Sequence, residues 1–164
     1  MSSLFHRTSV RKFQDRPVER EKIERVLRAA MQAPSAVNQQ PWEFFVVTNP
    51  EKKEALTEVT PYIRFGKKAP VIIVLAYRVH STAPLFTDID MAICTENLWL
   101  ACDEEGLGGT MCGIAPVEAQ IERASKILEL PDDLRVFTIF PMGYPAEERA
   151  QQDRFDESRI HYVD

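Results

Sequence analysis

The sequence has few histidines and cysteines, the residues that most often bind metals or act as nucleophiles. It contains three of each, and no two cysteines have the Cys-x-x-Cys spacing of a metal or redox site. If Cys94 and Cys102 share one helix, they lie about 12 Å apart, which is too far for a disulfide. The sequence therefore predicts neither a metal centre nor a disulfide framework, and this cysteine usage fits a reducing cytoplasm.

A net positive charge and a long hydrophobic run are also missing. The 164 residues carry a formal net charge of −5, which argues against nucleic acid as a partner, because nucleic-acid binders present a basic face. No apolar stretch approaches the length of a membrane span, and residues 1–7 contain no apolar run of the secretory kind. We expect a single domain over residues 1–164, with no membrane or nucleic-acid partner.

Motifs for catalysis by side chains are absent as well. There is no Gly-x-Ser-x-Gly nucleophile elbow and no phosphate loop of the Walker type. Ser9 and Lys12 match Ser-x-x-Lys, but no companion motif of a serine acyl-enzyme follows, so we attribute the match to chance. Either the chain is not an enzyme or a cofactor supplies the chemistry.

The hydrophobic pattern that is present predicts helices alternating with strands. Apolar residues at helical spacing predict helices over 18–31 and 117–130. The Asn49-Pro50 start predicts a short helix over 49–58, and the long segment over 88–105 is the longest helical candidate. Runs of β-branched and aromatic residues predict strands over 42–48, 70–76 and 136–145.

Two segments are candidates for packing against a surface outside their own domain. The middle of the 88–105 helix is apolar nearly all round, so a partner subunit is expected to cover it. Residues 146–164 are charged and have little to bury, so they are either disordered or laid over another surface.

Three polar or glycine-rich segments are candidates for a site. Residues 33–42 form a proline-bracketed loop that is longer and more polar than a chain reversal needs, although a plain surface loop closed by Trp42 is the alternative. Residues 7–13 combine arginines with hydroxyls and suit a phosphate, unless they are a solvated basic patch. Residues 106–113 contain four glycines, which would cap a helix at Gly106 and let the backbone approach something flat or bulky.

Four stretches, in the same order along the chain, resemble the FMN-dependent nitroreductases. Residues 7–13 resemble the opening Arg-x-Ser-x-Arg signature, and residues 33–42 resemble the Ala-Pro-Ser-x-x-Asn-x-Gln-Pro-Trp loop. Residues 90–108 resemble the central helix with its glycine turn, and residues 143–145 followed by Arg154 resemble the close of the family's domain. The resemblance implies an α+β fold with a mixed central β-sheet flanked by helices, in an intimate homodimer with two FMN sites at the interface.

The resemblance also implies which residues bind FMN. The matching positions are Arg7, Thr8, Ser9, Arg11 and Arg154 around the phosphate and pyrimidine, Pro34, Ser35, Ala36, Asn38 and Gln40 in a loop reaching in from the other subunit, and Cys112 and Gly113 in the turn facing flavin N5 and O4.

The implied activity is transfer of a hydride from NADH or NADPH to a nitroaromatic, quinone or similar small-molecule acceptor. Both substrates would use one face of the flavin in turn, which gives ping-pong kinetics. Arg11 would stabilise the negative charge left near flavin N1 and O2. The alternatives are a flavin-binding redox sensor or store without turnover, a structural dimer that has lost FMN, and another flavin chemistry on the same fold, such as reductive dehalogenation.

Overall fold

The computed structural model describes residues 2–148, 150–151 and 153–163, which build one five-stranded sheet and its covering helices. The long strands are β1 (Trp42–Val47), β2 (Val71–Arg78) and β5 (Leu134–Gly143). The short strands β3 (Gly108–Gly109) and β4 (Cys112–Gly113) both pair with β5. All pairings between these strands are antiparallel, and Ser9 adds one parallel bridge to Gly109.

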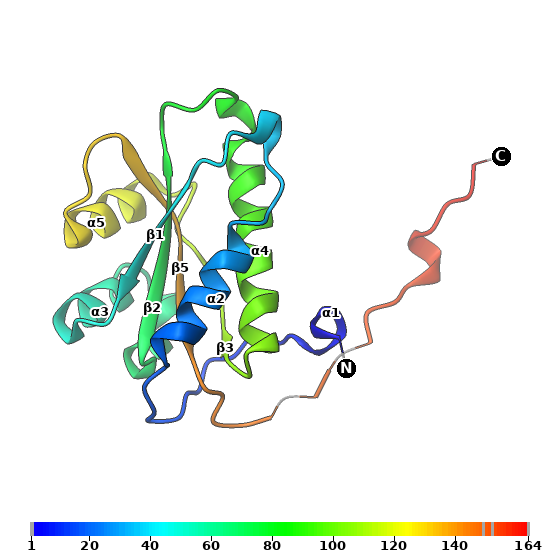
Figure 1. The fold of residues 1–164 in the computed structure, drawn as a ribbon, viewed down its shortest axis with the longest axis horizontal. Coiled ribbons are helices and arrows are strands. Elements are labelled where there is room, and N and C mark those ends of the chain that lie inside the picture. The colour runs from blue at the N-terminus through cyan, green and yellow to red at the C-terminus, as the bar shows by residue number, and fades with distance from the viewer. Residues whose placement is uncertain (1, 149, 152, 164) are drawn as a thin grey trace.

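Helices cover both faces of this sheet, as Figure 1 shows. On one face lie α2 (Arg20–Ala30) and α4 (Thr87–Glu104), and on the other lie α3 (Pro50–Thr57) and α5 (Glu118–Leu128). The remaining helical turns are short: α1 (Ser3–His6), η1 (Ala36–Asn38), η2 (Pro61–Lys68), η3 (Pro84–Phe86) and η4 (Glu157–Arg159).

The core explains why the sequence of β2 does not alternate between apolar and polar residues. Every residue from Val71 to Ala76 is buried. Ile73 points into the cluster formed with α2 and α4, whereas Ile72 and Val74 point into the cluster formed with α3 and α5. A strand that is covered on both faces is apolar on both faces, so its run of hydrophobic residues is continuous.

Local chemistry sets where the helices begin and which face they bury. The side chain of Asn49 accepts a hydrogen bond from the Lys52 backbone N–H at 2.9 Å, and Pro50 occupies the first turn of α3, where its missing N–H is not needed. In α2, Ile23, Val26 and Ala30 recur at helical spacing and are the buried residues.

The expected α+β class is confirmed, and each expected helix and strand is present within a few residues of its expected ends. The pattern missed α1 and the two-residue strands, which are too short to show a period, and it also missed η2, a 3-10 helix that does not repeat with the period of an α-helix. Within the described part of the chain, no helix is both long and apolar enough to cross a bilayer. The C-terminal tail runs away from the sheet (Figure 1), and none of its described residues from 150 onward is buried.

Candidate cofactor site

The N-terminal arginine segment is held extended along β3. The Val10 N–H donates to the Gly109 carbonyl at 3.0 Å, and the Thr110 hydroxyl donates to the Val10 carbonyl at 2.8 Å. Val10 is buried at 8% exposure, and a Cβ on Gly108 would lie 2.4 Å from its Cγ2. Side chains of an extended chain alternate, so Ser9 and Arg11 share the side opposite Val10.

A groove of about 880 Å³ opens on that side. Its walls combine guanidinium groups with hydroxyls, a combination that suits a phosphate, because an arginine presents a fork of N–H donors to paired oxygen atoms. Four of the expected phosphate-side residues come from the N-terminal segment, and the fifth comes from the tail. These residues are Arg7, Thr8, Ser9, Arg11 and Arg154.

The Arg7 side chain is the most enclosed of these cations. Its Cζ lies 4.2 Å from the centre of the Trp99 ring on α4, and its Nε lies 3.6 Å from a Glu96 carboxylate oxygen. The side chain is 17% exposed, and its Nη1 is buried with no hydrogen-bond partner among the described residues. A buried N–H without a partner costs free energy.

Arg11 connects the groove to the turn at Cys112 and Gly113. Its Cζ lies 5.9 Å from the Phe65 ring centre. Burial raises the pKa of the Cys112 thiol to about 12, and the nearby positive charge of Arg11 opposes that rise. The thiol is therefore protonated near neutral pH and is a packing group, and of the two residues of this turn it is Gly113 that is exposed.

The four glycines of residues 106–113 do not all serve the same purpose. Gly106 has φ +69° and ends α4, as expected. Gly109 is required by the protein's own packing, because a Cβ there would lie 2.3 Å from the Phe140 ring. Gly108 and Gly109 therefore bring the backbone close to Val10 and to the Phe140 ring, which are groups of the chain itself. Gly113 differs, since its Cβ would meet no described atom nearer than 3.9 Å.

The loop before β1 holds three residues that are not glycine in left-handed backbone conformations. Val37 has φ 47° and ψ 27°, Asn38 has φ 55° and Gln40 has φ 44°. A β-branched residue such as Val37 rarely adopts this region. Strain of this kind persists only where the surroundings impose it, and it clusters at functional sites.

Hydrogen bonds within the chain impose this shape. The Ser35 hydroxyl accepts from the Gln40 N–H at 3.0 Å, and the Gln39 amide donates to Asp90 at 2.6 Å and to the Ala83 carbonyl at 3.1 Å. The expectation that the polar loop exceeds what its own chain needs is therefore wrong for Ser35 and Gln39. Val37 is 72% exposed, and Pro34, Asn38 and Gln40 are also exposed.

Within one chain, the loop and the arginine groove lie toward opposite ends of α4. The loop is attached at Asp90, whose carboxylate accepts from the Ala36 N–H at 2.9 Å. Arg7 stacks on Trp99, nine residues later, which is about 14 Å along a helix axis. The structure thus brings the phosphate-side residues together, and it holds Pro34, Ser35, Ala36, Asn38 and Gln40 elsewhere.

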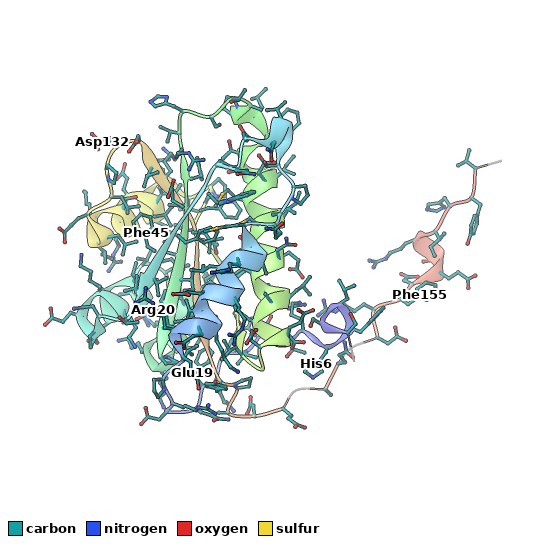
Figure 2. All side chains as sticks on the ribbon, viewed as in Figure 1. His6, Glu19, Arg20, Phe45, Asp132 and Phe155 are labelled. Atoms are coloured by element: carbon teal, nitrogen blue, oxygen red, sulfur yellow. The ribbon has the colours of Figure 1, made fainter. Side chains whose placement is uncertain are left out.

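Other polar groups around these segments have partners. Asn97 donates to the Ala29 carbonyl at 3.2 Å, and Lys67 lies 2.7 Å from a Glu58 carboxylate oxygen. His6 bonds to Asp103 at 2.8 Å and joins α1 to the end of α4, where Figure 2 labels it. In the described part of the chain, no group of three or more histidine, cysteine or acidic side chains is arranged to hold a metal ion.

Sequence reasoning missed Trp99 and Asp90 as residues that support the site. The only signal for Asp90 was an acidic residue in the first turn of an otherwise apolar helix. For Trp99 there was none, because its ring contacts an arginine 92 positions away.

The fold and the site define a class: an α+β domain with helices on both faces of its sheet and an arginine-lined groove. The model of the Nitroreductase family matches residues 4–63 and 58–144. The chain belongs to the nitroreductase family.

Individual relatives agree with this membership. A protein of Methanothermobacter thermautotrophicus, provisionally named NADH dehydrogenase/NAD(P)H nitroreductase, is 42% identical over 98% of this chain and 85% of its own length. A structure from Clostridium acetobutylicum, provisionally named NADH oxidase, has a TM-score of 0.94 and 37% identity, covering 97% of each chain. An FMN-dependent nitroreductase from Clostridium difficile has a TM-score of 0.91 and 27% identity, covering 99% of this chain and 98% of its own.

Proposed function

We propose that this protein is an FMN-dependent NAD(P)H oxidoreductase that acts as a cytoplasmic homodimer and reduces nitroaromatic, quinone or similar acceptors. The observation that carries the proposal is the groove in which Arg7, Ser9, Arg11 and Arg154 meet, in a chain of the nitroreductase family. FMN supplies two-electron hydride chemistry when bound, so the chain's own residues need only bind it, orient it and stabilise charge.

The residues present fit this cofactor. The buried Nη1 of Arg7 is a donor in need of an acceptor, and a phosphate provides one. Arg11, near Cys112, supplies positive charge between the groove and the glycine turn. Gly113 leaves its backbone open on a side where its own chain places no described atom within 3.9 Å of a Cβ. Together these groups would hold the phosphate and support the pyrimidine side of the ring.

The homodimer is supported by the large apolar side chains that one chain leaves exposed. On α1, Leu4 and Phe5 are 72% and 68% exposed; Leu85 in η3 is 91% exposed, and Ile89 at the start of α4 is 57% exposed. A second copy that lies along α4 would cover these side chains. It would also cover the middle of α4, as we expect from the sequence of that helix.

A second copy would also complete the site. The loop carrying Asn38 is attached about 14 Å along α4 from the ring that supports Arg7, so a site using both within one chain would have to span that length. We propose that each site takes Arg7 and Arg11 from one protomer and the loop from its partner. Residues 146–164, whose Phe155 is 74% exposed (Figure 2), would lie over the partner.

The first experiment is a visible spectrum of the purified protein, followed by NADH and NADPH oxidation with a quinone. A flavin spectrum with NAD(P)H consumption is the expected result. Flavin without turnover would indicate a redox sensor or store, and a colourless protein that cannot be loaded with FMN would reject the proposal.

Mixed dimers test the shared site. One variant carries Arg7→Ala and Arg11→Ala, and the other carries Ser35→Ala and Asn38→Ala; each is first shown to fold and to be nearly inactive. After the two are unfolded and refolded together, about half the dimers are mixed, and one of the two sites in each mixed dimer is intact. About a quarter of all sites should then be active. Activity no higher than the mean of the two variants would show that each site is built within one chain.

A further inference from the structure

The loop that presents Asn38 is attached to the body of the protein by a buried carboxylate. Asp90 is 2% exposed, and its two oxygens accept from the Ala36 N–H at 2.9 Å and from the Gln39 amide at 2.6 Å. It lies in the first turn of α4, where the partial positive charge of the helix N-terminus favours a negative group. A carboxylate can therefore stay buried here while both of its oxygens serve the loop.

The two bonds lie on either side of Val37 and Asn38, two of the three left-handed residues of the loop. Ala36 precedes Val37 and Asn38, the residues with φ of 47° and 55°, and Gln39 follows them. The left-handed pair is thus fixed at both ends by one side chain. A β-branched residue leaves this conformation readily when it is not restrained. The two bonds from Asp90, which we call the clamp, therefore set the fraction of molecules in which the loop has this shape.

The Gln39 amide extends the clamp to a third segment. Its oxygen accepts from the Ala83 N–H at 2.8 Å, while its NH2 group donates to the Ala83 carbonyl at 3.1 Å and to Asp90. The donors and acceptor of this amide are therefore all used within the chain. Gln39 is a structural residue of the loop, and the side chains left exposed at its tip are Val37 and Asn38.

We infer that Asp90 is a positioning residue for the cofactor site: it holds the left-handed residues Val37 and Asn38 in the shape in which Asn38 reaches the flavin of the partner subunit. This inference rests on the proposed function. Asp90 touches no part of the cofactor in this scheme and acts through the population of one loop conformation. The apparent FMN affinity then falls by the factor by which that population falls.

The test compares Asp90→Asn with Asp88→Asn in the full-length protein. Both residues lie in the first turn of α4, and both substitutions remove one negative charge there, but Asp88 is exposed. Asparagine at position 90 keeps one oxygen and turns an NH2 group toward a donor of the loop. We expect it to weaken FMN binding about tenfold, because one lost bond to a charged acceptor corresponds to a factor of about ten or more. Asp88→Asn should leave binding unchanged.

Two readouts separate positioning from general damage. Amide hydrogen exchange at residues 36–40, measured with and without FMN, should become faster in Asp90→Asn and stay unchanged in Asp88→Asn. Adding Val37→Asn to Asp90→Asn should restore part of the FMN affinity, because asparagine tolerates the left-handed conformation that valine resists. If Asp90 only stabilised the protein as a whole, a substitution at an exposed residue of the loop would not restore FMN affinity.

The outcomes distinguish this inference from the proposed function. A wild-type protein that binds no FMN would overturn both. A wild type that binds FMN, together with an Asp90→Asn variant of equal affinity or one that Val37→Asn fails to rescue, would overturn the positioning role alone. If Asp90→Asn does not fold, Gln39→Met removes the same contact from the loop side, and unchanged FMN affinity in that variant would also overturn it.

Discussion

Replacing Arg7 by alanine should separate the binding of the FMN phosphate from the stability of the protein. In the protein without FMN, two effects of the substitution oppose each other. The contact with Trp99, at 4.2 Å from the ring centre, is lost, and such contacts contribute about 0.5–2 kcal/mol. The buried Nη1 without a partner is removed as well, which relieves a penalty of about 1–3 kcal/mol. The middles of these two ranges differ by about 1 kcal/mol, so we expect the free energy of unfolding without FMN to change by about that amount.

The affinity for FMN should change much more than the free energy of unfolding. A charge-assisted hydrogen bond from Arg7 to the phosphate contributes about 1.5–3 kcal/mol, so the Kd for FMN should rise by a factor of about ten to a hundred. The affinity for riboflavin, which has no phosphate, should fall much less. The measurement is quenching of flavin fluorescence on titration of each ligand with the protein, alongside chemical denaturation of the flavin-free variant.

Arg16→Ala is the matched control for this experiment. Arg16 also stacks on an aromatic ring, with its Cζ 3.9 Å from the centre of Tyr144, and it also pairs with a glutamate, at 2.8 Å from Glu19. It does not line the groove that contains Arg154. Its replacement should leave FMN affinity unchanged. The assignment of Arg7 to the phosphate would be refuted if Arg7→Ala lost equal affinity for FMN and for riboflavin. It would also be refuted if Arg16→Ala bound FMN as weakly as Arg7→Ala does.

Three further predictions follow from the same structure. Gly113→Ala should leave the flavin-free stability unchanged and weaken FMN binding. Gly109→Ala should destabilise the fold, because its Cβ would lie 2.3 Å from Phe140. If the two variants gave equal effects in chemical denaturation and in FMN titration, this prediction would be contradicted. Steady-state rates at several NAD(P)H and quinone concentrations should give parallel double-reciprocal lines, and intersecting lines would exclude one shared site. The hydrogen bond from Tyr144 is the main cause that lowers the Glu19 pKa from 4.5 to about 2, so Glu19 stabilises the fold above pH 4.5 and this contribution is lost as the pH falls toward 2. Tyr144→Phe should therefore be less stable than the wild type at pH 7, with a difference that shrinks toward pH 2; a difference independent of pH in acid denaturation would show that this bond does not set the pKa.

The sequence by itself determined the secondary structure and the class of protein. Apolar spacing in α2 and α4 and the unbroken run in β2 act over a few neighbouring residues, so they can be read without the fold. The Arg-x-Ser-x-Arg segment at residues 7–11 could also be interpreted locally, because arginines and hydroxyls that lie close together in the sequence suit a phosphate.

The tertiary structure alone decided which of the candidate groups are used within the chain. Gly108 and Gly109 are explained by Val10 and Phe140, which meet them only after β3 has docked, whereas Gly113 remains open. No local pattern reports such contacts, since the partners lie up to about a hundred positions away in the sequence.

The same reason applies to the two residues that support the site. Arg7 rests on Trp99, and the strained turn at Val37 is held by Asp90, in each case across more than fifty positions. Whether a polar atom is buried, satisfied or left without a partner depends on everything that packs around it. That is why the sequence could name Arg7 and Asn38 as candidates, while only the folded chain shows the unsatisfied Nη1 of Arg7 and the buried carboxylate that clamps the loop of Asn38.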